Sequence, residues 1–221
     1  MYIKFQDLSL TFKTNTQTIP IFHDLNLSFE KGSYTVIYGA SGKGKSTLLN
    51  LVSGYVIPNK GKVLIDNTDI SHMPEKQKCE YRNKKTGYMF QNFNLIQQLN
   101  VRDNVAVPLF IAGISKKEAY LQVENLLSKI NMTSRMYEYP NTLSGGEQQR
   151  VAFARAIANN PEIILADEPI ANLDRENGNI ILQLFEELWK KGVTFLCVSH
   201  DQRMRNDQYS ALDIETLSLA K

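Results

Sequence analysis

The feature that most restricts how this chain can fold is the segment Gly39–Thr47, which reads GASGKGKST. It matches the pattern G-x-x-x-x-G-K-[S/T] in one frame only. The apolar run Tyr34–Tyr38 precedes it, and Ser46–Val52 begins a predicted helix. In a strand–loop–helix unit of this kind, backbone N–H groups curl around phosphate beside the positive helix end. The alternative, a glycine-rich turn with a chance lysine, leaves the flanking strand and helix unexplained. The segment therefore predicts an α/β fold that binds a nucleotide.

Individual side chains of this loop have distinct expected roles. Lys45 should reach the β- and γ-phosphates, Ser46 should hold Mg²⁺, and Thr47 should bind phosphate oxygens. Lys43 either helps to neutralise phosphate or is a solvated surface lysine. The residues expected to surround the phosphates are Gly39, Ala40, Ser41, Gly42, Lys43, Gly44, Lys45, Ser46 and Thr47.

A second motif is the apolar segment Ile163–Ala166 followed by Asp167 and Glu168, which has the form of a Walker B strand. An apolar strand that ends in two acids places both at the carboxyl edge of a sheet, where ligands of α/β folds bind. Asp167 is expected to bind Mg²⁺ through water, and Glu168 to act as the general base for the attacking water. A solvated strand end is the alternative for this motif taken alone.

Two more polar residues follow apolar segments. Gln91 comes after Gly87–Phe90, and His200 after Val193–Ser199. A glutamine amide at a strand end can reach Mg²⁺ or the attacking water. A neutral imidazole can bind the γ-phosphate and stabilise transition-state charge. A lone histidine or glutamine is normally structural, so both assignments depend on the other motifs.

The octet Leu143–Arg150, LSGGEQQR, is the most specific motif of the chain. Ser144 is a good N-cap for a helix that begins near Gly145 and Gly146, and Glu147 lies in its first turn. Such a helix end, bare of side chains, can press its N–H groups onto a γ-phosphate. A capped helix without a ligand is the alternative, but it does not explain the whole octet.

With these motifs in this order, nearly the whole chain resembles the ATP-binding cassette (ABC) ATPases. The resemblance implies that Ser144, Gly145, Gly146 and Glu147 close over the ATP of a second copy of the chain. It also implies that Gln91 is the Q-loop residue, that His200 is the switch histidine, and that Asn172–Asp174 is the D-loop. Phe12 falls where the family places an adenine-stacking aromatic ring; the alternative is an aromatic residue packed in the β layer.

Within the family, Phe90–Leu95 and Asp103–Leu109 resemble the branch of lipoprotein-releasing, macrolide-export and cell-division ATPases. The resemblance implies a cytoplasmic ATPase subunit, bound to the cell membrane through a permease that docks near Tyr88–Ile111. It leaves open whether the complex exports a substrate, releases lipoproteins or transmits force. Two other functions stay as alternatives: a soluble ABC ATPase acting on DNA or ribosomes, and a scaffold that binds nucleotide without hydrolysis.

The pattern along the chain predicts one ABC ATPase domain over residues 1–221. The first thirty residues alternate apolar and polar, which indicates antiparallel strands that turn at Thr14–Thr18. The region 94–159 is expected to be a helical subdomain, with an apolar stripe formed by Leu121, Val123, Leu126, Leu127 and Ile130. The fold predicted is a P-loop α/β core with a mostly parallel sheet, an antiparallel β layer and this helical insert.

Composition limits the remaining possibilities. A net charge of +2 gives no electrostatic reason to expect a nucleic-acid partner. The longest apolar runs, such as Val105–Ile111, are far shorter than the ~20 residues that span a bilayer, so a membrane role is expected to come through a partner. Cys197 lies in an apolar run and Cys79 in a polar stretch, so no disulfide framework is expected.

Overall fold

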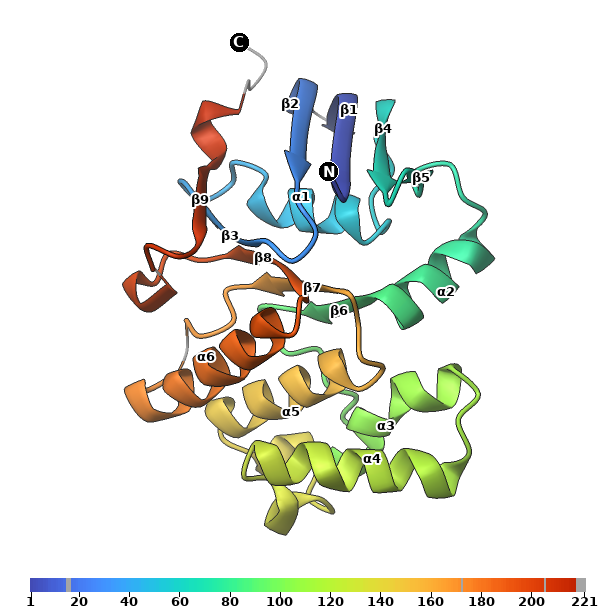
Figure 1. Ribbon diagram of the computed structural model, residues 1–221, viewed down its shortest axis with the longest axis vertical. Helices are drawn as coiled ribbons and strands as arrows, with labels where there is room; N and C mark the ends of the chain where they lie inside the picture. Colours follow the sequence, from blue (N-terminus) through green and yellow to red (C-terminus); the bar gives the residue numbers. More distant parts are fainter. Residues whose placement is uncertain (15–16, 172, 205, 218–221) are drawn as a thin grey trace.

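The computed structural model describes residues 1–14, 17–171, 173–204 and 206–217 of the chain. Its strands form two sheets, with helix α1 (Lys45–Val52) between them and four further helices below the larger sheet (Figure 1). The predicted combination of a parallel core sheet, an antiparallel β layer and helices is therefore confirmed. Among the residues described, no helix has the length and apolarity that crossing a membrane requires.

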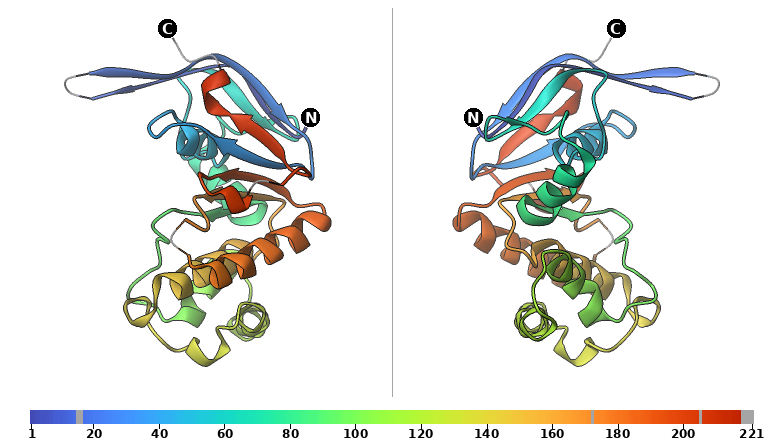
Figure 2. Two further views of the ribbon diagram at one scale, coloured as in Figure 1. Left: turned by 90° about the vertical axis from the view of Figure 1, so that its left-hand side faces the viewer. Right: turned by 90° about the vertical axis from the view of Figure 1, so that its right-hand side faces the viewer.

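The smaller sheet is antiparallel and has the strand order β2-β1-β4-β5. Its strands are β1 (Ile3–Lys13), β2 (Thr18–Phe29), β4 (Lys60–Ile65) and β5 (Thr68–Asp69). Strands β1 and β2 pair from Ile3 opposite Phe29 to Lys13 opposite Thr18, and their far end projects from the molecule (Figure 2). The predicted antiparallel pairing is confirmed; of the predicted turn, Asn15 and Thr16 lie outside the described residues.

The larger sheet is parallel throughout and has the order β6-β7-β8-β3-β9. Its strands are β3 (Tyr34–Tyr38), β6 (Thr86–Met89), β7 (Ile163–Asp167), β8 (Thr194–Val198) and β9 (Ser210–Asp213). Because all five strands run the same way, their carboxyl ends share one edge of the sheet. The residues that follow β3, β6, β7 and β8 are therefore brought together there.

Side chains of the core sheet alternate between two hydrophobic cores. One face carries Ile37, Leu165 and Val198, which pack with α1 (Lys45–Val52) and the antiparallel sheet. The opposite face carries Val36 and Cys197, which pack with the helices below. This period of two is the geometry of a strand, and burial on both faces explains why these strands read as continuous apolar runs. Cys197 is fully buried and Cys79 is exposed, and neither forms a disulfide.

Four helices lie below the core sheet and share the hydrophobic core on that side (Figure 1). They are α3 (Val101–Ile111), α4 (Lys116–Lys129), α5 (Gly145–Ile157) and α6 (Arg175–Lys190). The predicted stripe on α4 is wrong at one position: Ala119, Val123 and Leu127 are buried, whereas Leu121 is 55% exposed. Buried positions four residues apart define one helix face, and Leu121 stands two residues from Ala119 and Val123, on the other side.

Helix α2 (Glu75–Lys85) was not predicted, because its sequence EKQKCEYRNKK has almost no apolar stripe. It begins after Pro74, and its buried side chains are Lys78 and Tyr81; the Tyr81 hydroxyl donates to the Val52 carbonyl at 2.9 Å. Two buried positions, one of them a lysine, leave no apolar periodicity in the sequence.

Candidate active site

The glycine-rich loop joins the end of β3 to the start of α1, as its pattern predicts. Gly39 and Gly44 both have positive φ, at 131° and 89°. A Cβ on Gly39 would lie 2.4 Å from Ile214 Cγ2, and one on Gly44 would lie 2.7 Å from Ile21 Cγ2. Both conformation and space therefore require glycine at these two positions.

Of the two lysines in the loop, Lys45 is the buried one, and it is hydrogen-bonded to the loop. Its side chain is buried, and Nζ donates to the carbonyls of Gly39 at 2.7 Å and Ala40 at 2.8 Å. The ammonium therefore lies inside the curve of the loop, next to the N–H groups that open helix α1. Lys43 is exposed, which fits the solvated alternative for that residue.

Asp167 lies at the carboxyl end of β7, directly beside the loop. Burial raises the pKa of Asp167, while a hydrogen bond from the Ser46 hydroxyl and the positive charge of Lys45 act in the opposite direction. A hydroxyl and a carboxylate oxygen in contact are the hard ligands that Mg²⁺ prefers. The two residues present therefore fit the Mg²⁺ role that the sequence assigns to them.

Glu168 and His200 face each other across the ends of β7 and β8. His200 Nε2 lies 3.6 Å from Glu168 Oε1, and the backbone N–H of His200 donates to Glu168 Oε2 at 3.3 Å. The Ser199 hydroxyl donates to the same oxygen at 3.4 Å. The Glu168 side chain is 12% exposed and that of His200 is 55% exposed, so the carboxylate is held in the site while the imidazole borders its opening.

The backbone at Glu168 is strained, with a φ of +48° in the left-handed region. A non-glycine residue seldom adopts this conformation, and the residue before a proline is normally extended. Backbone strain of this kind concentrates at functional sites, where surrounding contacts maintain it. Here the Glu168 N–H donates to the Val198 carbonyl at 2.9 Å, which fixes the bend at the end of β7.

A cavity of about 460 Å³ brings most of the predicted residues together. The predicted residues that line it are Ser41, Gly42, Gly44, Lys45, Ser46, Thr47, Gln91, Asp167, Glu168 and His200. Ile21 and Val198 also line the cavity, and neither was predicted. An isoleucine in a strand gives no sequence signal for a ligand site, because it reads as a core residue.

Phe12 lies apart from this cavity. It stands near the far end of β1, opposite Ile19 of β2, and the two side chains are 40% and 41% exposed. The ring is therefore not packed in the β layer, which was the alternative considered for it. Its adenine-stacking role stays a prediction.

The residues of the octet LSGGEQQR (Leu143–Arg150), which resembles the signature motif of the ABC ATPases, also lie outside the cavity. Ser144 caps helix α5: its Oγ accepts from Glu147 N at 3.3 Å, and its own N–H donates to Glu147 Oε2 at 2.8 Å. A Cβ on Gly145 would meet nothing within 4 Å, so the helix end is open at that residue. The chain thus presents a capped helix N-terminus outside its own nucleotide cavity.

The predicted D-loop is described only in part, since Asn172 lies outside the described residues. Leu173 is buried, and Asp174 caps helix α6 by accepting from Asn177 N at 2.8 Å. Nearer to Glu168, the chain is tied to helix α5, because buried Gln149 donates to the Pro169 carbonyl at 2.6 Å.

A family model for ABC transporters matches residues 22–171. The chain belongs to the ABC transporter family. As an ABC ATPase it resembles the ATP-binding protein YtrE of Bacillus subtilis, at 40% identity over 91% of this chain and 88% of that protein. The lipoprotein-releasing ATP-binding protein LolD of Colwellia psychrerythraea is 41% identical, over 84% of this chain and 72% of LolD.

Solved structures agree with this assignment. The ATP-binding cassette MJ0796, determined as a dimer in a post-hydrolysis state bound to ADP and Pi, superposes with a TM-score of 0.86 at 37% identity. The match covers 91% of this chain and 89% of that one. The predicted fold and the predicted ATPase activity are therefore both confirmed.

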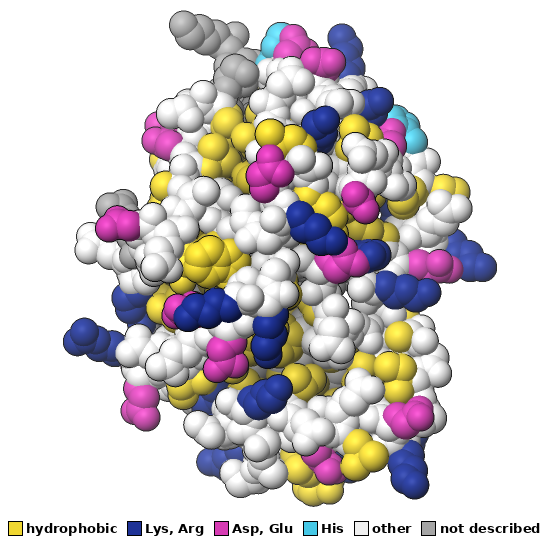
Figure 3. Space-filling model, viewed as in Figure 1, with side chains coloured by type: hydrophobic (Ala, Val, Ile, Leu, Met, Phe, Trp, Pro, Cys, Tyr) yellow, Lys and Arg dark blue, Asp and Glu magenta, His cyan; other side chains and the backbone are white. Residues whose placement is uncertain are grey.

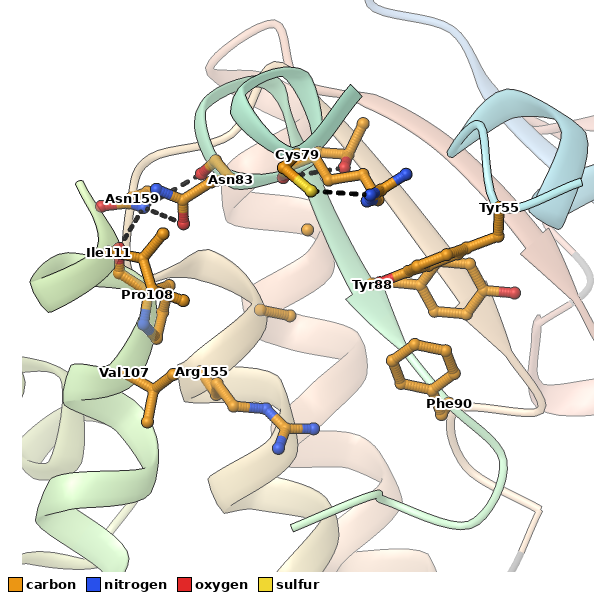
Figure 4. Close-up of a pocket in the computed structure, with 14 residues that line it drawn as sticks. Tyr55, Cys79, Asn83, Tyr88, Phe90, Val107, Pro108, Ile111, Arg155 and Asn159 are labelled. Carbon is orange, nitrogen blue, oxygen red and sulfur yellow. Dashed lines mark hydrogen bonds between the residues drawn. The ribbon is translucent and has the colours of Figure 1, made fainter. Parts of the chain in front are cut away.

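This ABC ATPase also has an apolar groove, of about 380 Å³, between the core sheet and α3. Along one wall, Tyr88 stacks on Phe90 and Tyr55 meets Tyr88 edge-on. The opposite wall is formed by Val107, Pro108 and Ile111 of α3 (Figure 4). Arg155 of α5 points into the space between the walls (Figure 4). Burial lowers the pKa of Arg155, and its guanidinium is anchored on the carbonyls of Phe93 and Asn94, both at 2.6 Å.

Proposed function

We propose that the chain is the ATP-hydrolysing subunit of a membrane transport complex, and that two copies enclose two ATP–Mg²⁺ between them. The observation that carries the proposal is the separation of the site into two parts. Lys45, Asp167 and Glu168 line the nucleotide cavity, whereas the open helix end at Ser144–Gly146 lies outside it. A second copy, turned to face the first, completes each site with its own signature. The dimeric MJ0796 cassettes support this arrangement.

Within each site, Lys45 would neutralise the β- and γ-phosphates, and Ser46, Asp167 and Gln91 would hold Mg²⁺ directly or through water. The ion would supply positive charge that offsets the negative charge developing on the phosphate oxygens. Glu168 orients the attacking water and accepts its proton, for which the strained backbone and the contacts of its carboxylate hold it in place. His200, 3.6 Å from Glu168, stabilises charge on the γ-phosphate.

The partner we propose is an integral membrane permease of the kind that works with the lipoprotein-releasing and macrolide-export ATPases. Its cytoplasmic element would enter the groove between Tyr88 and Ile111. An exposed apolar groove next to the Gln91 loop favours this site, since isolated soluble surfaces seldom keep such patches. The subunit would then lie at the cytoplasmic face of the cell membrane, held there by the permease.

The charge distribution gives no support to a nucleic-acid partner. Lysine and arginine side chains are interspersed with acidic ones over the face shown in Figure 3, in line with the net charge of +2. A protein that binds nucleic acid through its phosphates needs a continuous basic surface.

The test is the variant Glu168→Gln, which keeps the shape of the side chain and removes the base. With ATP and Mg²⁺ it should accumulate as a dimer, detected by sedimentation velocity, and hydrolysis should fall at least about 100-fold. With ADP the same variant should stay monomeric. A variant that remains monomeric at saturating ATP, both alone and with its co-purified membrane partner, contradicts the two-copy site.

A further inference from the structure

Arg203, three residues after the switch histidine, is the centre of a hydrogen-bond network that the nucleotide site does not use directly. Its guanidinium donates to both carboxylate oxygens of Asp201: Nε to Oδ1 and Oδ2 at 3.0 Å, and Nη2 to Oδ2 at 2.6 Å. Its backbone N–H donates to Asp201 Oδ1 at 2.8 Å. The arginine holds the pKa of Asp201 below its usual value, so the pair stays charged at neutral pH.

The other side of the same guanidinium binds the segment that follows Glu168. Nη2 donates to the carbonyls of Ile170 at 3.1 Å and Leu173 at 3.4 Å, and Nη1 donates to that of Asp174 at 3.3 Å. Only a planar fork with several donors can reach three carbonyls and a carboxylate together. Arg203 therefore links Ile170, Leu173 and Asp174 to the loop that carries His200.

Helix α6 makes room for this side chain at Gly178. A Cβ at that position would lie 2.5 Å from Arg203 Nη1. Glycine within a helix is unfavourable relative to alanine, so its presence here matches the need for space beside the guanidinium. The position of Arg203 is thus fixed by α6 as well as by the two loops.

One end of the network reaches the hydrolytic residues. The backbone N–H of Asp201 donates to the Ser199 hydroxyl at 3.0 Å, and that hydroxyl donates to Glu168 Oε2 at 3.4 Å. His200 stands between Ser199 and Asp201 and contacts the same carboxylate. A displacement of Glu168 or His200 is therefore transmitted to Asp201, because only one or two contacts separate them.

The other end reaches the signature of the same chain. Asp174 accepts from the backbone N–H of Asn177 at 2.8 Å and from its side-chain amide at 2.6 Å. The Asn177 side chain in turn borders the signature turn: a Cβ at Gly146 would lie 3.2 Å from its Cγ and Nδ2. The contacts from Arg203 through Asp174 and Asn177 thus end at the start of helix α5.

We propose that Arg203 is a positioning residue that couples the two functional ends of one chain: Glu168 and His200 at its own nucleotide, and the signature turn Ser144–Gly146. The proposal rests on the proposed function, in which that turn closes over the ATP of the second copy. Because the guanidinium binds Ile170, Leu173 and Asp174 as well as Asp201, the change at the γ-phosphate on hydrolysis moves these residues together with the His200 loop. The signature turn is then displaced from the ATP of the partner.

The first test is hydrogen exchange of the nucleotide-free chain, which needs no dimer. In Arg203→Met, the amides of Asn177 and Gly178 should exchange about tenfold faster, and those of Glu147 and Gln148 several-fold faster. Amides of β7 and β8 should keep their protection, which shows that the core is intact. Arg203→Lys retains one charged contact with Asp201 and loses the fork, so it should resemble Arg203→Met near Asn177.

The control is Lys190→Met, which removes the 2.8 Å ion pair between Lys190 and Glu186 on helix α6. It should leave the exchange of all four amides unchanged.

The second test separates binding from closure. Arg203→Met should bind a fluorescent ATP analogue within about twofold of the parent, because Lys45 and the loop are untouched. In the Glu168→Gln background it should need about tenfold more protein to form the ATP-dependent dimer. With Glu168 intact, kcat should fall while KM for ATP changes little.

Unchanged exchange at Glu147 and Gln148 overturns the coupling, whatever the dimer does, because the link to the signature turn is then absent. Unchanged dimer formation and kcat in Arg203→Met overturn it as well. If instead the parent Glu168→Gln protein never dimerises, the proposed two-copy site is what fails, and the exchange experiment still decides the role of Arg203.

Discussion

At the scale of single residues, Glu168 combines the role of general base that we propose for it with an unfavourable backbone conformation. Its φ of +48° comes directly before Pro169, where an extended conformation is the normal one. Asparagine tolerates positive φ better than glutamine does. We therefore expect the unfolding free energy of Glu168→Asn to exceed that of Glu168→Gln by up to about 1 kcal/mol, and its melting temperature to be higher.

Both variants should lose hydrolysis by at least about 100-fold, since neither side chain accepts a proton. Thermal unfolding and ATP hydrolysis measured on the same preparations provide the check. If Glu168→Gln were the more stable of the two, the backbone strain at this position would not lower the unfolding free energy. Retained hydrolysis in either variant would assign the base to another residue.

The two lysines of the glycine-rich loop allow a matched comparison. Lys45 is buried and bound to the carbonyls of Gly39 and Ala40, whereas Lys43 is exposed and lines no part of the cavity. Lys45→Ala should abolish measurable hydrolysis, because the charge at the β- and γ-phosphates is lost. Lys43→Ala should change kcat and KM by less than about threefold. Equal losses in the two variants would show that Lys43 also neutralises phosphate.

At the scale of elements, the sequence was informative where one physical signal dominates. The strands Tyr34–Tyr38 and Ile163–Asp167 are buried on both faces, so unbroken apolar runs reveal them. Helix α2 and strand β9 (Ser210–Asp213) gave no such signal. The helix is almost entirely polar, and the strand is mostly exposed at the edge of the sheet, so tertiary contacts decide their structure.

Helix α5 depends on Ser144 for its cap and, by our proposal, for contact with the partner's ATP. These two roles can be separated. Ser144→Ala should cost about 1 kcal/mol in unfolding free energy, because Glu147 N loses its acceptor. Ser144→Asp should keep the cap and the stability, since aspartate is an equally good N-cap.

Both substitutions should impair the ATP-dependent dimer, but Ser144→Asp more severely, since it places a negative charge against the γ-phosphate. Sedimentation in the Glu168→Gln background measures this. A dimer that forms normally with Ser144→Asp would place the signature away from phosphate.

Glu162, directly before β7, links three distant parts of the chain and should make stability depend on pH. It accepts from the Lys85 ammonium and, at 2.7 Å, from the Tyr2 hydroxyl, and these contacts hold its pKa below the usual value of 4.5. A depressed carboxyl pKa contributes stability above pH 4.5, and this contribution is lost as pH falls through the folded-state pKa.

Glu162→Gln should therefore lower the unfolding free energy by about 1 kcal/mol at pH 7, a value discounted for partial exposure. The difference from the parent should shrink below pH 4.5. Urea unfolding at pH 7 and near pH 4 measures it. A difference that is the same at both values would mean that the charge of Glu162 contributes nothing.

At the scale of the whole molecule, the sequence predicted the contents of the nucleotide cavity better than its boundaries. Gln91, Asp167 and His200 could be placed in advance because each follows a strand, and parallel strands end at one edge. Ile21 could not, since it reaches the cavity only through the packing of the antiparallel sheet over α1. That the signature lies outside the cavity was expected from family resemblance alone, because no local pattern states which chain a helix end faces.

The groove between the core sheet and α3 permits a test of the permease site with a closely matched control. Ile111 lines the groove and is 67% exposed, and Leu121 of α4 is 55% exposed but lies outside it. A glutamate at either position should leave the unfolding free energy within about 0.5 kcal/mol of the parent, since neither side chain is buried. Ile111→Glu should reduce the membrane protein that co-purifies from a detergent extract by about tenfold or more, because docking would bury an unpaired charge. Leu121→Glu should retain it. ATP hydrolysis by the isolated subunit should be the same in both variants, because neither residue lines the nucleotide cavity. Equal co-purification of the membrane protein with both variants would exclude the groove as the docking site.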